Sequence, residues 1–219
     1  FDLALKTTIK SSFSNQGQIC LCGSRIFIQK KIYKKFVKKF VKETEKIVIG
    51  PPSEKKSQLG ALISENHLKK IEYYVDLAKK EGGKILTGGG KVNLSGKFSK
   101  GYYYKPTIIE GLDMNCKVNK EEIFGPVVTV IPFDSEKEVI FLANQSDYGL
   151  SSSIWTENLT TAHRVSSKLD SGIIWVNSWL LRDLRTPFGG MKNSGIGREG
   201  GYKSLEFFTE TKNVCLNFD

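Results

Sequence analysis

Two cysteines that stand one residue apart are the strongest candidates for chemistry in this sequence. Cys20 and Cys22 lie in S-N-Q-G-Q-I-C-L-C-G-S-R-I-F, between polar residues with a glycine and an apolar run typical of a strand. A cysteine in such a loop becomes a strong nucleophile when backbone N–H groups or positive charge stabilise its thiolate. The residues alone leave two interpretations of Cys20 open, a nucleophile or a buried filler, and they favour the filler for Cys22.

The cysteine pattern fits neither a disulfide framework nor a metal site. Cys20 and Cys22 would point to opposite faces of an extended segment, so we do not expect them to pair, and the other two cysteines are distant in sequence. Structural zinc usually needs C-x-x-C pairs with further Cys or His ligands, whereas His67 and His163 lie far from the cysteines. We therefore expect no metal, and a reducing compartment, the cytoplasm.

A net charge of +10 could indicate nucleic-acid binding, but the distribution of charge argues against it. Lysines cluster between Lys30 and Lys42, where apolar residues recur at helical spacing, so these lysines occupy the solvent face of a predicted helix. Arginine, the better ligand for phosphates and bases, is scattered. No segment approaches the roughly 18 apolar residues of a membrane span. We expect neither a nucleic-acid nor a membrane partner.

Strands and helices alternate with short connections, most regularly between Pro126 and Asn177. Such alternation implies right-handed crossovers and a mainly parallel sheet with flanking helices, so we predict the α/β class. The predicted strands are 24–29, 84–87, 102–110, 126–133, 149–156 and 172–177. Among them, 102–110 is predicted at a sheet edge, because Pro106 cannot donate to a central ladder. A helix is predicted to begin at Ser64 as N-cap, and the chain is predicted to end in a short helix and a lone strand.

The glycine cluster G-I-G-R-E-G, from Gly195 to Gly200, matches the letters of a dinucleotide-binding motif but not its context. That motif needs a buried strand before it and a helix at its end, whereas a loop, R-T-P-F-G-G-M-K-N-S, precedes it here. We interpret the cluster as a loop whose backbone bends closely around a neighbouring group.

Four segments in this order resemble the aldehyde dehydrogenase superfamily: the cysteine segment, E-E-I-F-G-P-V-V, G-I-I-W-V-N and P-F-G-G-M-K-N-S-G-I-G-R-E-G. The resemblance covers almost the whole chain. It implies the family's catalytic domain at residues 1–203 and a C-terminal oligomerisation strand within 204–219, through which a homo-oligomer would form. The family's N-terminal cofactor domain would be absent. Since the chain opens without methionine, we expect it to be part of a longer protein.

The resemblance also implies the chemistry of the individual residues. Cys20 would attack an aldehyde as a thiolate, its own N–H would stabilise the resulting oxyanion, and hydride would pass to NAD before the thioester is hydrolysed. Glu122 matches the family's ligand of the nicotinamide ribose, and Phe124 matches the aromatic residue beside it. His67 stands where many relatives carry a cofactor-facing glutamine, although a surface histidine on a helix is an equal alternative.

N-S-W-L-L-R-D-L-R-T-P-F-G-G resembles the branch of the family that acts on 2-aminomuconic and hydroxymuconic semialdehydes, in tryptophan (kynurenine) catabolism. In that branch an arginine matching Arg182 clamps the substrate carboxylate; the alternative is a surface arginine paired with Asp183. Arg185 lacks this match. The family's catalytic glutamate, oxyanion asparagine and second arginine would all lie upstream of Phe1. Two further possibilities are a thiol-dependent esterase without NAD and an inert domain that assembles with full-length subunits.

Overall fold

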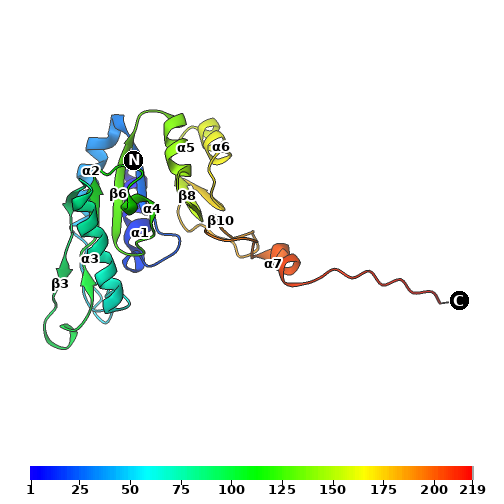
Figure 1. The fold of residues 1–219 in the computed structure, drawn as a ribbon, viewed down its shortest axis with the longest axis horizontal. Coiled ribbons are helices and arrows are strands. Elements are labelled where there is room, and N and C mark those ends of the chain that lie inside the picture. Colours follow the sequence, from blue (N-terminus) through cyan, green and yellow to red (C-terminus); the bar gives the residue numbers. More distant parts are fainter. Residues whose placement is uncertain (219) are drawn as a thin grey trace.

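The computed structural model describes residues 1–218, with helices and strands interspersed along the chain (Figure 1). The helices are α1 (Asp2–Phe13), α2 (Lys30–Thr44), α3 (Glu65–Lys80), α4 (Lys117–Lys120), α5 (Glu136–Asn144), α6 (Leu159–Ser166) and α7 (Gly201–Phe208). The strands are β1 (Arg25–Gln29), β2 (Lys84–Thr87), β3 (Lys91–Val92), β4 (Tyr103–Tyr104), β5 (Thr107–Glu110), β6 (Val127–Phe133), β7 (Tyr148–Gly149), β8 (Ser151–Ile154), β9 (Ile173–Val176) and β10 (Met191–Lys192). No helix within residues 1–218 is both long and apolar enough to cross a membrane.

The central sheet has four strands in the order β1-β6-β5-β2. Strands β1, β6 and β5 run parallel, and β2 joins β5 in the antiparallel direction. A second, separate pair, β8 and β9, is also parallel, whereas β3–β4 and β7–β10 are short antiparallel pairs. The predicted α/β class with parallel strands is confirmed, although the strands are divided among several sheets.

The prediction of an edge strand at residues 102–110 was wrong. Thr107–Glu110 lies inside the central sheet, hydrogen-bonded to β6 on one side and β2 on the other. Pro106 precedes this strand, so its missing N–H removes no bond from the ladder. Tyr103–Tyr104, on the other side of the proline, pairs with β3 instead. The proline therefore separates two strands rather than marking an edge.

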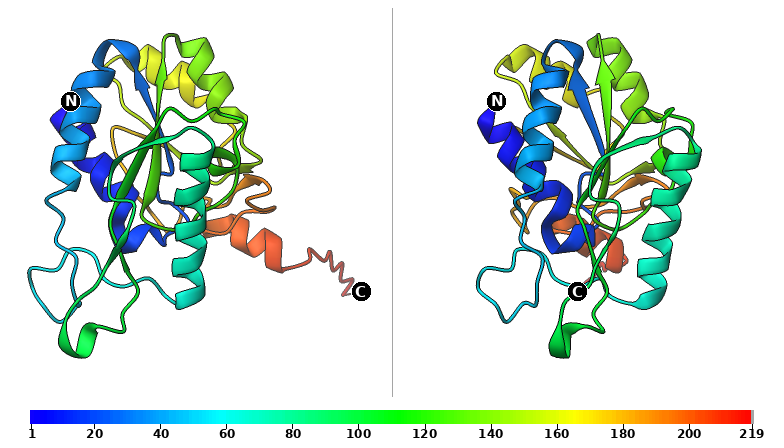
Figure 2. Two further views of the ribbon diagram at one scale, coloured as in Figure 1. Left: turned by 60° about the vertical axis from the view of Figure 1, so that its left-hand side comes forward. Right: turned by 90° about the vertical axis from the view of Figure 1, so that its left-hand side faces the viewer.

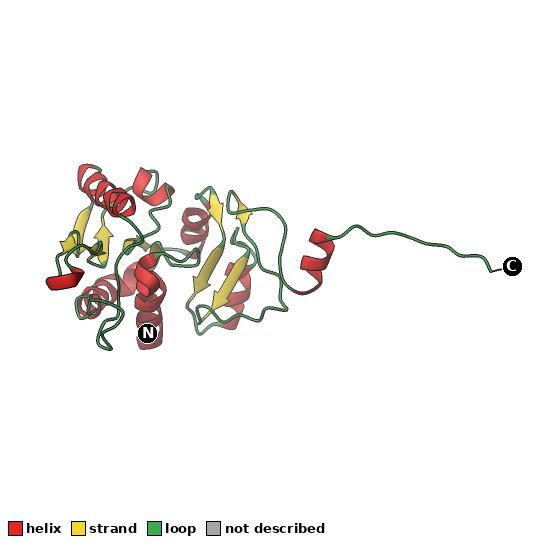
Figure 3. Ribbon diagram, turned by 90° about the horizontal axis from the view of Figure 1, so that it is seen from below, coloured by secondary structure: helices red, strands yellow, loops and turns green. Residues whose placement is uncertain are grey.

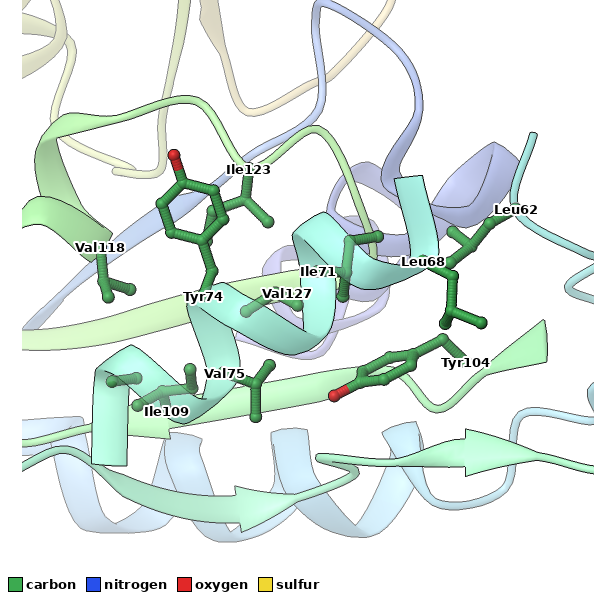
Figure 4. Close-up of a cluster of buried hydrophobic side chains, with 11 residues drawn as sticks. Leu62, Leu68, Ile71, Tyr74, Val75, Tyr104, Ile109, Val118, Ile123 and Val127 are labelled. Carbon is green, nitrogen blue, oxygen red and sulfur yellow. The ribbon is translucent and has the colours of Figure 1, made fainter. Parts of the chain in front are cut away.

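Two adjacent residues of β5, Ile108 and Ile109, are fully buried in different hydrophobic cores. Because side chains alternate across a strand, neighbours reach opposite faces of the sheet. Ile109 packs with Ile71 and Val75 of α3 (Figure 4), whereas Ile108 packs on the face covered by α1 and α2. The strands thus lie between two helical layers (Figure 2).

Side-chain caps mark where α3, α5 and α6 begin. The Ser64 hydroxyl accepts a hydrogen bond of 3.2 Å from the His67 N–H, which confirms the predicted N-cap of α3. Ser135 and Glu138 form a capping box at α5. The cap at Ser64 places His67 in the first turn of α3, at the end of the helix that faces the candidate site.

Beyond α7 the described tail, residues 209–218, contains no strand and runs away from the rest of the chain (Figures 1 and 3). Val214, Leu216 and Phe218 are 65%, 72% and 89% exposed. Their spacing of two residues is that of one face of a strand. The boundary predicted between residues 203 and 204 falls within α7, and the division into two domains stays a prediction.

Candidate active site

The loop before Cys20 has a left-handed backbone at three consecutive residues. Asn15, Gln16 and Gly17 have φ values of 49°, 58° and 70°. A turn closed by the Cys22 N–H and the Ile19 carbonyl, at 2.9 Å, follows them. Non-glycine residues in this region cost about 1–3 kcal/mol each and concentrate where function requires a special geometry. The sequence therefore holds Cys20 at the tip of a tightly bent loop.

The two cysteines of this loop have different environments. Cys20 is exposed, and its N–H donates to no acceptor among the residues the structure describes. An unpaired N–H beside a thiol can stabilise an oxyanion that forms on an attacked carbonyl. Cys22 is half-buried, and burial raises the pKa of its thiol from 9.0 to about 11. Cys22 is consequently a poor nucleophile near neutral pH.

Iodoacetamide at pH 8 is expected to alkylate Cys20 in the folded chain and to leave Cys22 almost unmodified. With a pKa near 11, only about one Cys22 in a thousand is a thiolate at that pH. Because the folded state favours the protonated thiol, this site stabilises the fold below about pH 9 and loses that contribution as the pH rises through 11. Peptide mass spectrometry, before and after unfolding in urea, measures the extent of alkylation at Cys20 and at Cys22. Equal native rates at Cys20 and Cys22 would contradict this assignment.

The segment from Glu121 to Pro126 carries the two residues expected to bind the cofactor. Glu122 is exposed, and its carboxylate has no hydrogen bond or ion pair with any residue in the described part of the chain. Phe124 is partly buried and has a φ of 58°, in the left-handed region. An unpaired carboxylate can accept two hydroxyl hydrogens, and a fixed ring beside it can pack on a sugar or a flat heterocycle. These side chains therefore suit the nicotinamide ribose of NAD.

The Phe124 segment and the Cys20 loop touch through two glycines. A Cβ on Gly17 would lie 2.1 Å from the Gly125 carbonyl oxygen, so only glycine allows this approach. On its other side Gly125 meets α3, because a Cβ there would lie 2.3 Å from Ile71 Cδ1. The expected cofactor and nucleophile segments are thus in backbone contact.

Gly17→Ala is expected to lower the free energy of unfolding by about 2–4 kcal/mol, because it adds both a left-handed strain and a clash with Gly125. Urea unfolding measures the change. Gly96→Ala is the matched control, since Gly96 also has a positive φ, 62°, but no atom within 4 Å of a built Cβ. The free energy of unfolding of that variant should fall by only about 1 kcal/mol. Equal losses in the two variants would show that the contact with Gly125 contributes nothing.

The structure brings His67 and Phe124 together. The imidazole Nε2 of His67 lies 2.6 Å from the Phe124 carbonyl oxygen, and the two rings meet edge to face with centroids 6.3 Å apart. Since a carbonyl only accepts, Nε2 must carry the hydrogen. His67 is partly buried on the first turn of α3.

A third segment, residues 177–190, contacts the Cys20 loop through a tryptophan. The Trp179 Nε1–H donates to the Leu21 carbonyl at 2.8 Å, and Leu21 follows Cys20 directly. Asn177 and Leu180 are also left-handed, with φ values of 52° and 60°. Trp179 could not be predicted from the sequence, since an indole that donates to a carbonyl 158 residues away has no local signature.

Arg182 lies in this third segment and has a preformed anion partner. Its guanidinium donates to Glu199 Oε1 at 3.1 Å and stacks 4.1 Å from the centroid of Phe188. The alternative was right that Arg182 is exposed but wrong about its partner, because Asp183 forms its ion pair with Arg185. Glu199 belongs to the glycine cluster, whose loop was predicted but whose pairing was not. Arg182 can therefore hold a carboxylate, and a bound acid would compete with Glu199 for it.

The glycine cluster bends around its neighbours as predicted. A Cβ on Gly197 would lie 2.4 Å from the Phe207 ring, and one on Gly200 would lie 2.2 Å from the Thr186 carbonyl oxygen. The preceding strand, β10, is a short antiparallel partner of β7, unlike the buried parallel strand of a dinucleotide fold. The loop packs the Arg182 segment against α7.

Two segments far apart in the chain thus contact the loop that carries the exposed Cys20: the Glu122 and Phe124 segment through Gly125, and the Arg182 segment through Trp179. Residues 1–214 match the pattern of the aldehyde dehydrogenase family. The chain belongs to this family.

Individual aldehyde dehydrogenases agree with this assignment. A 2-aminomuconic semialdehyde dehydrogenase of Bos taurus is 50% identical over 97% of this chain and 44% of its own length. A 2-hydroxymuconic semialdehyde dehydrogenase of Pseudomonas sp. (strain CF600) is 46% identical over 98% of this chain and 44% of its own length. The NAD+ complex of an aldehyde dehydrogenase from Bacillus cereus superposes with a TM-score of 0.93 and 40% identity, covering 100% of this chain and 43% of that one. This aldehyde dehydrogenase chain therefore spans less than half the length of the relatives it matches.

Proposed function

We propose that the chain is the catalytic half of an NAD-dependent aldehyde dehydrogenase that oxidises a carboxylate-bearing semialdehyde to the acid, of the 2-aminomuconic type in tryptophan (kynurenine) catabolism. The meeting of the Cys20, Phe124 and Arg182 segments carries this proposal. Relatives that are 46–50% identical and are named for muconic semialdehydes support the substrate class.

Each segment would have a separate task. The Cys20 thiolate attacks the aldehyde carbon, and its unpaired N–H binds the developing oxyanion. Arg182 holds the distal carboxylate of the substrate, so that the aldehyde lies against the thiol. Glu122 accepts the ribose hydroxyls and Phe124 packs beside them. NAD, when bound, supplies the hydride acceptor.

The remaining machinery would lie upstream of Phe1. By its resemblance to the family, the catalytic glutamate, the oxyanion asparagine, a second arginine and most of the NAD-binding surface belong to the missing half. The chain on its own is therefore expected to bind NAD weakly and to turn over slowly. Production of NADH from a muconic semialdehyde by the longer protein tests the proposal, and a longer protein without such activity would contradict it.

We also propose that the parent protein is a homo-oligomer joined through residues 204–219. Val214, Leu216 and Phe218 would form one apolar face if this tail paired as a strand, and all three are exposed in the single chain. A strand added to a second copy would cover them.

A second candidate function is a thiol-dependent esterase, because Cys20 and its N–H could accept an activated acyl group without NAD. Hydrolysis of a nitrophenyl ester by the chain alone, lost in Cys20→Ala, would support this activity. If the chain shows no hydrolysis and yet joins full-length subunits, it acts only as an assembling domain.

A further inference from the structure

One face of α3 contacts the segment that carries Glu122 and Phe124 at three successive points. His67, Ile71 and Tyr74 lie four and three residues apart, so they share one side of the helix. His67 binds the Phe124 carbonyl, Ile71 packs on Gly125, and the Tyr74 hydroxyl donates to Glu121 Oε2 at 2.8 Å. The helix thus contacts the segment before Phe124, at Phe124 and directly after it.

The polar contacts at the two ends of this face are well defined. Tyr74 is 7% exposed, and burial, reinforced by Glu121, raises its pKa to about 12. The phenol therefore remains a hydrogen-bond donor at every pH where the chain would work. At the other end of the face, the His67 Nε2–H donates to the Phe124 carbonyl at 2.6 Å.

The hydrogen bond from His67 is made to the residue of this segment whose backbone is strained. Phe124 has a φ of 58° without being glycine, a conformation that persists only when its surroundings impose it. The His67 bond holds the carbonyl of that same residue, and the carbonyl orientation fixes the peptide plane that follows it.

We propose that His67 is a positioning residue which, together with Tyr74, holds the Glu121–Gly125 backbone in the conformation that presents Glu122 and Phe124. His67 thus acts on the cofactor site through the Phe124 carbonyl rather than by touching the cofactor. The inference about the backbone stands on the chain alone, whereas its effect on NAD rests on the proposed function.

Nuclear magnetic resonance tests the bond directly, because the chain has only two histidines. A hydrogen-bonded imidazole N–H exchanges slowly with water, so one slowly exchanging ring proton is expected. His163 is exposed on α6, and His163→Leu should leave this signal in place, whereas His67→Leu should remove it. Absence of any such signal in the unmodified chain would overturn the proposal.

Limited proteolysis tests the positioning. A protease specific for glutamate should cleave the native chain after Glu121 or Glu122 about tenfold faster in His67→Leu, because a hydrogen bond to the strained backbone is lost. His67→Gln retains an N–H donor and should restore most of the resistance, Tyr74→Phe should accelerate cleavage by a smaller factor, and His163→Leu should change nothing. Unchanged cleavage in His67→Leu, or equal acceleration at glutamates throughout the chain, would overturn the proposal.

In the longer enzyme, His67→Leu should raise the KM for NAD about tenfold and change kcat little, with rescue by His67→Gln. If the protein makes no NADH at all, the proposed function fails while the proteolysis result still decides the role of His67. If NADH forms but KM is unchanged in His67→Leu, the positioning role fails alone.

Discussion

Replacing Cys20 by alanine is expected to abolish NADH formation by the longer protein, lowering kcat at least about 1,000-fold. Alanine removes the sulfur that would form the bond to the aldehyde carbon, and no other described group shares the tip of that loop. Steady-state absorbance of NADH with a muconic semialdehyde measures the effect. The Cys20 N–H remains in the variant, so the fold and the oxyanion donor are kept.

Cys22→Ala is the matched control for this experiment. The second thiol is half-buried and its raised pKa keeps it protonated, so its loss should change kcat by no more than about threefold. Cys20→Ser adds a graded test, because a hydroxyl at the same position is a much weaker nucleophile at neutral pH. Full activity in Cys20→Ala would remove the central assignment.

Replacing Arg182 by alanine is expected to raise the KM for a carboxylate-bearing semialdehyde about 10- to 100-fold, since it deletes a charge-assisted bidentate contact. The KM for an uncharged aldehyde of similar length should change by less than about threefold, because that aldehyde has no carboxylate for the guanidinium to bind. Arg182→Lys keeps the charge but loses the planar fork, so partial recovery is expected. Initial rates over a range of both substrates separate KM from kcat.

Arg185→Ala is the control within the same segment. Arg185 is 88% exposed and already pairs with Asp183, so its replacement should leave the KM for both substrates unchanged. Equal losses for the charged and the neutral aldehyde in Arg182→Ala would mean that Arg182 supports the loop, through Phe188 and Glu199, instead of selecting the substrate.

Local patterns predicted local structure well in this chain. The Ser64 cap, the lysine-faced helix and the strands of the region after Pro126 follow from periodicity and capping, which depend on neighbouring residues. The aldehyde dehydrogenase resemblance, carried by short segments, was confirmed by the family match. Cys20, Glu122, Phe124 and Arg182 could be named because each lies inside such a segment, whereas His67 was proposed from its position alone.

Features that depend on distant partners could not be predicted. The position of β5 inside the sheet requires both β6 and β2, so Pro106 alone gave the wrong answer. The Glu199 partner of Arg182 and the Trp179 bond to Leu21 join different segments. The left-handed Phe124 has no sequence signal either, because a bulky residue in that conformation is imposed by its neighbours.

The long separations within the site have a consequence for how the chain folds. The bond from Trp179 to the residue after Cys20 joins residues 158 positions apart, and the bond from His67 to Phe124 joins residues 57 positions apart. Contacts of such high order form slowly, because the entropy of closing long loops is lost before the contacts compensate for it. The helices, whose hydrogen bonds join near neighbours in sequence, should therefore form first, before the pairing of β1 with β6, which joins residues such as Arg25 and Thr129. We expect Cys20 to behave as an ordinary thiol early in folding, and the contacts that surround its loop to be among the last native features to form.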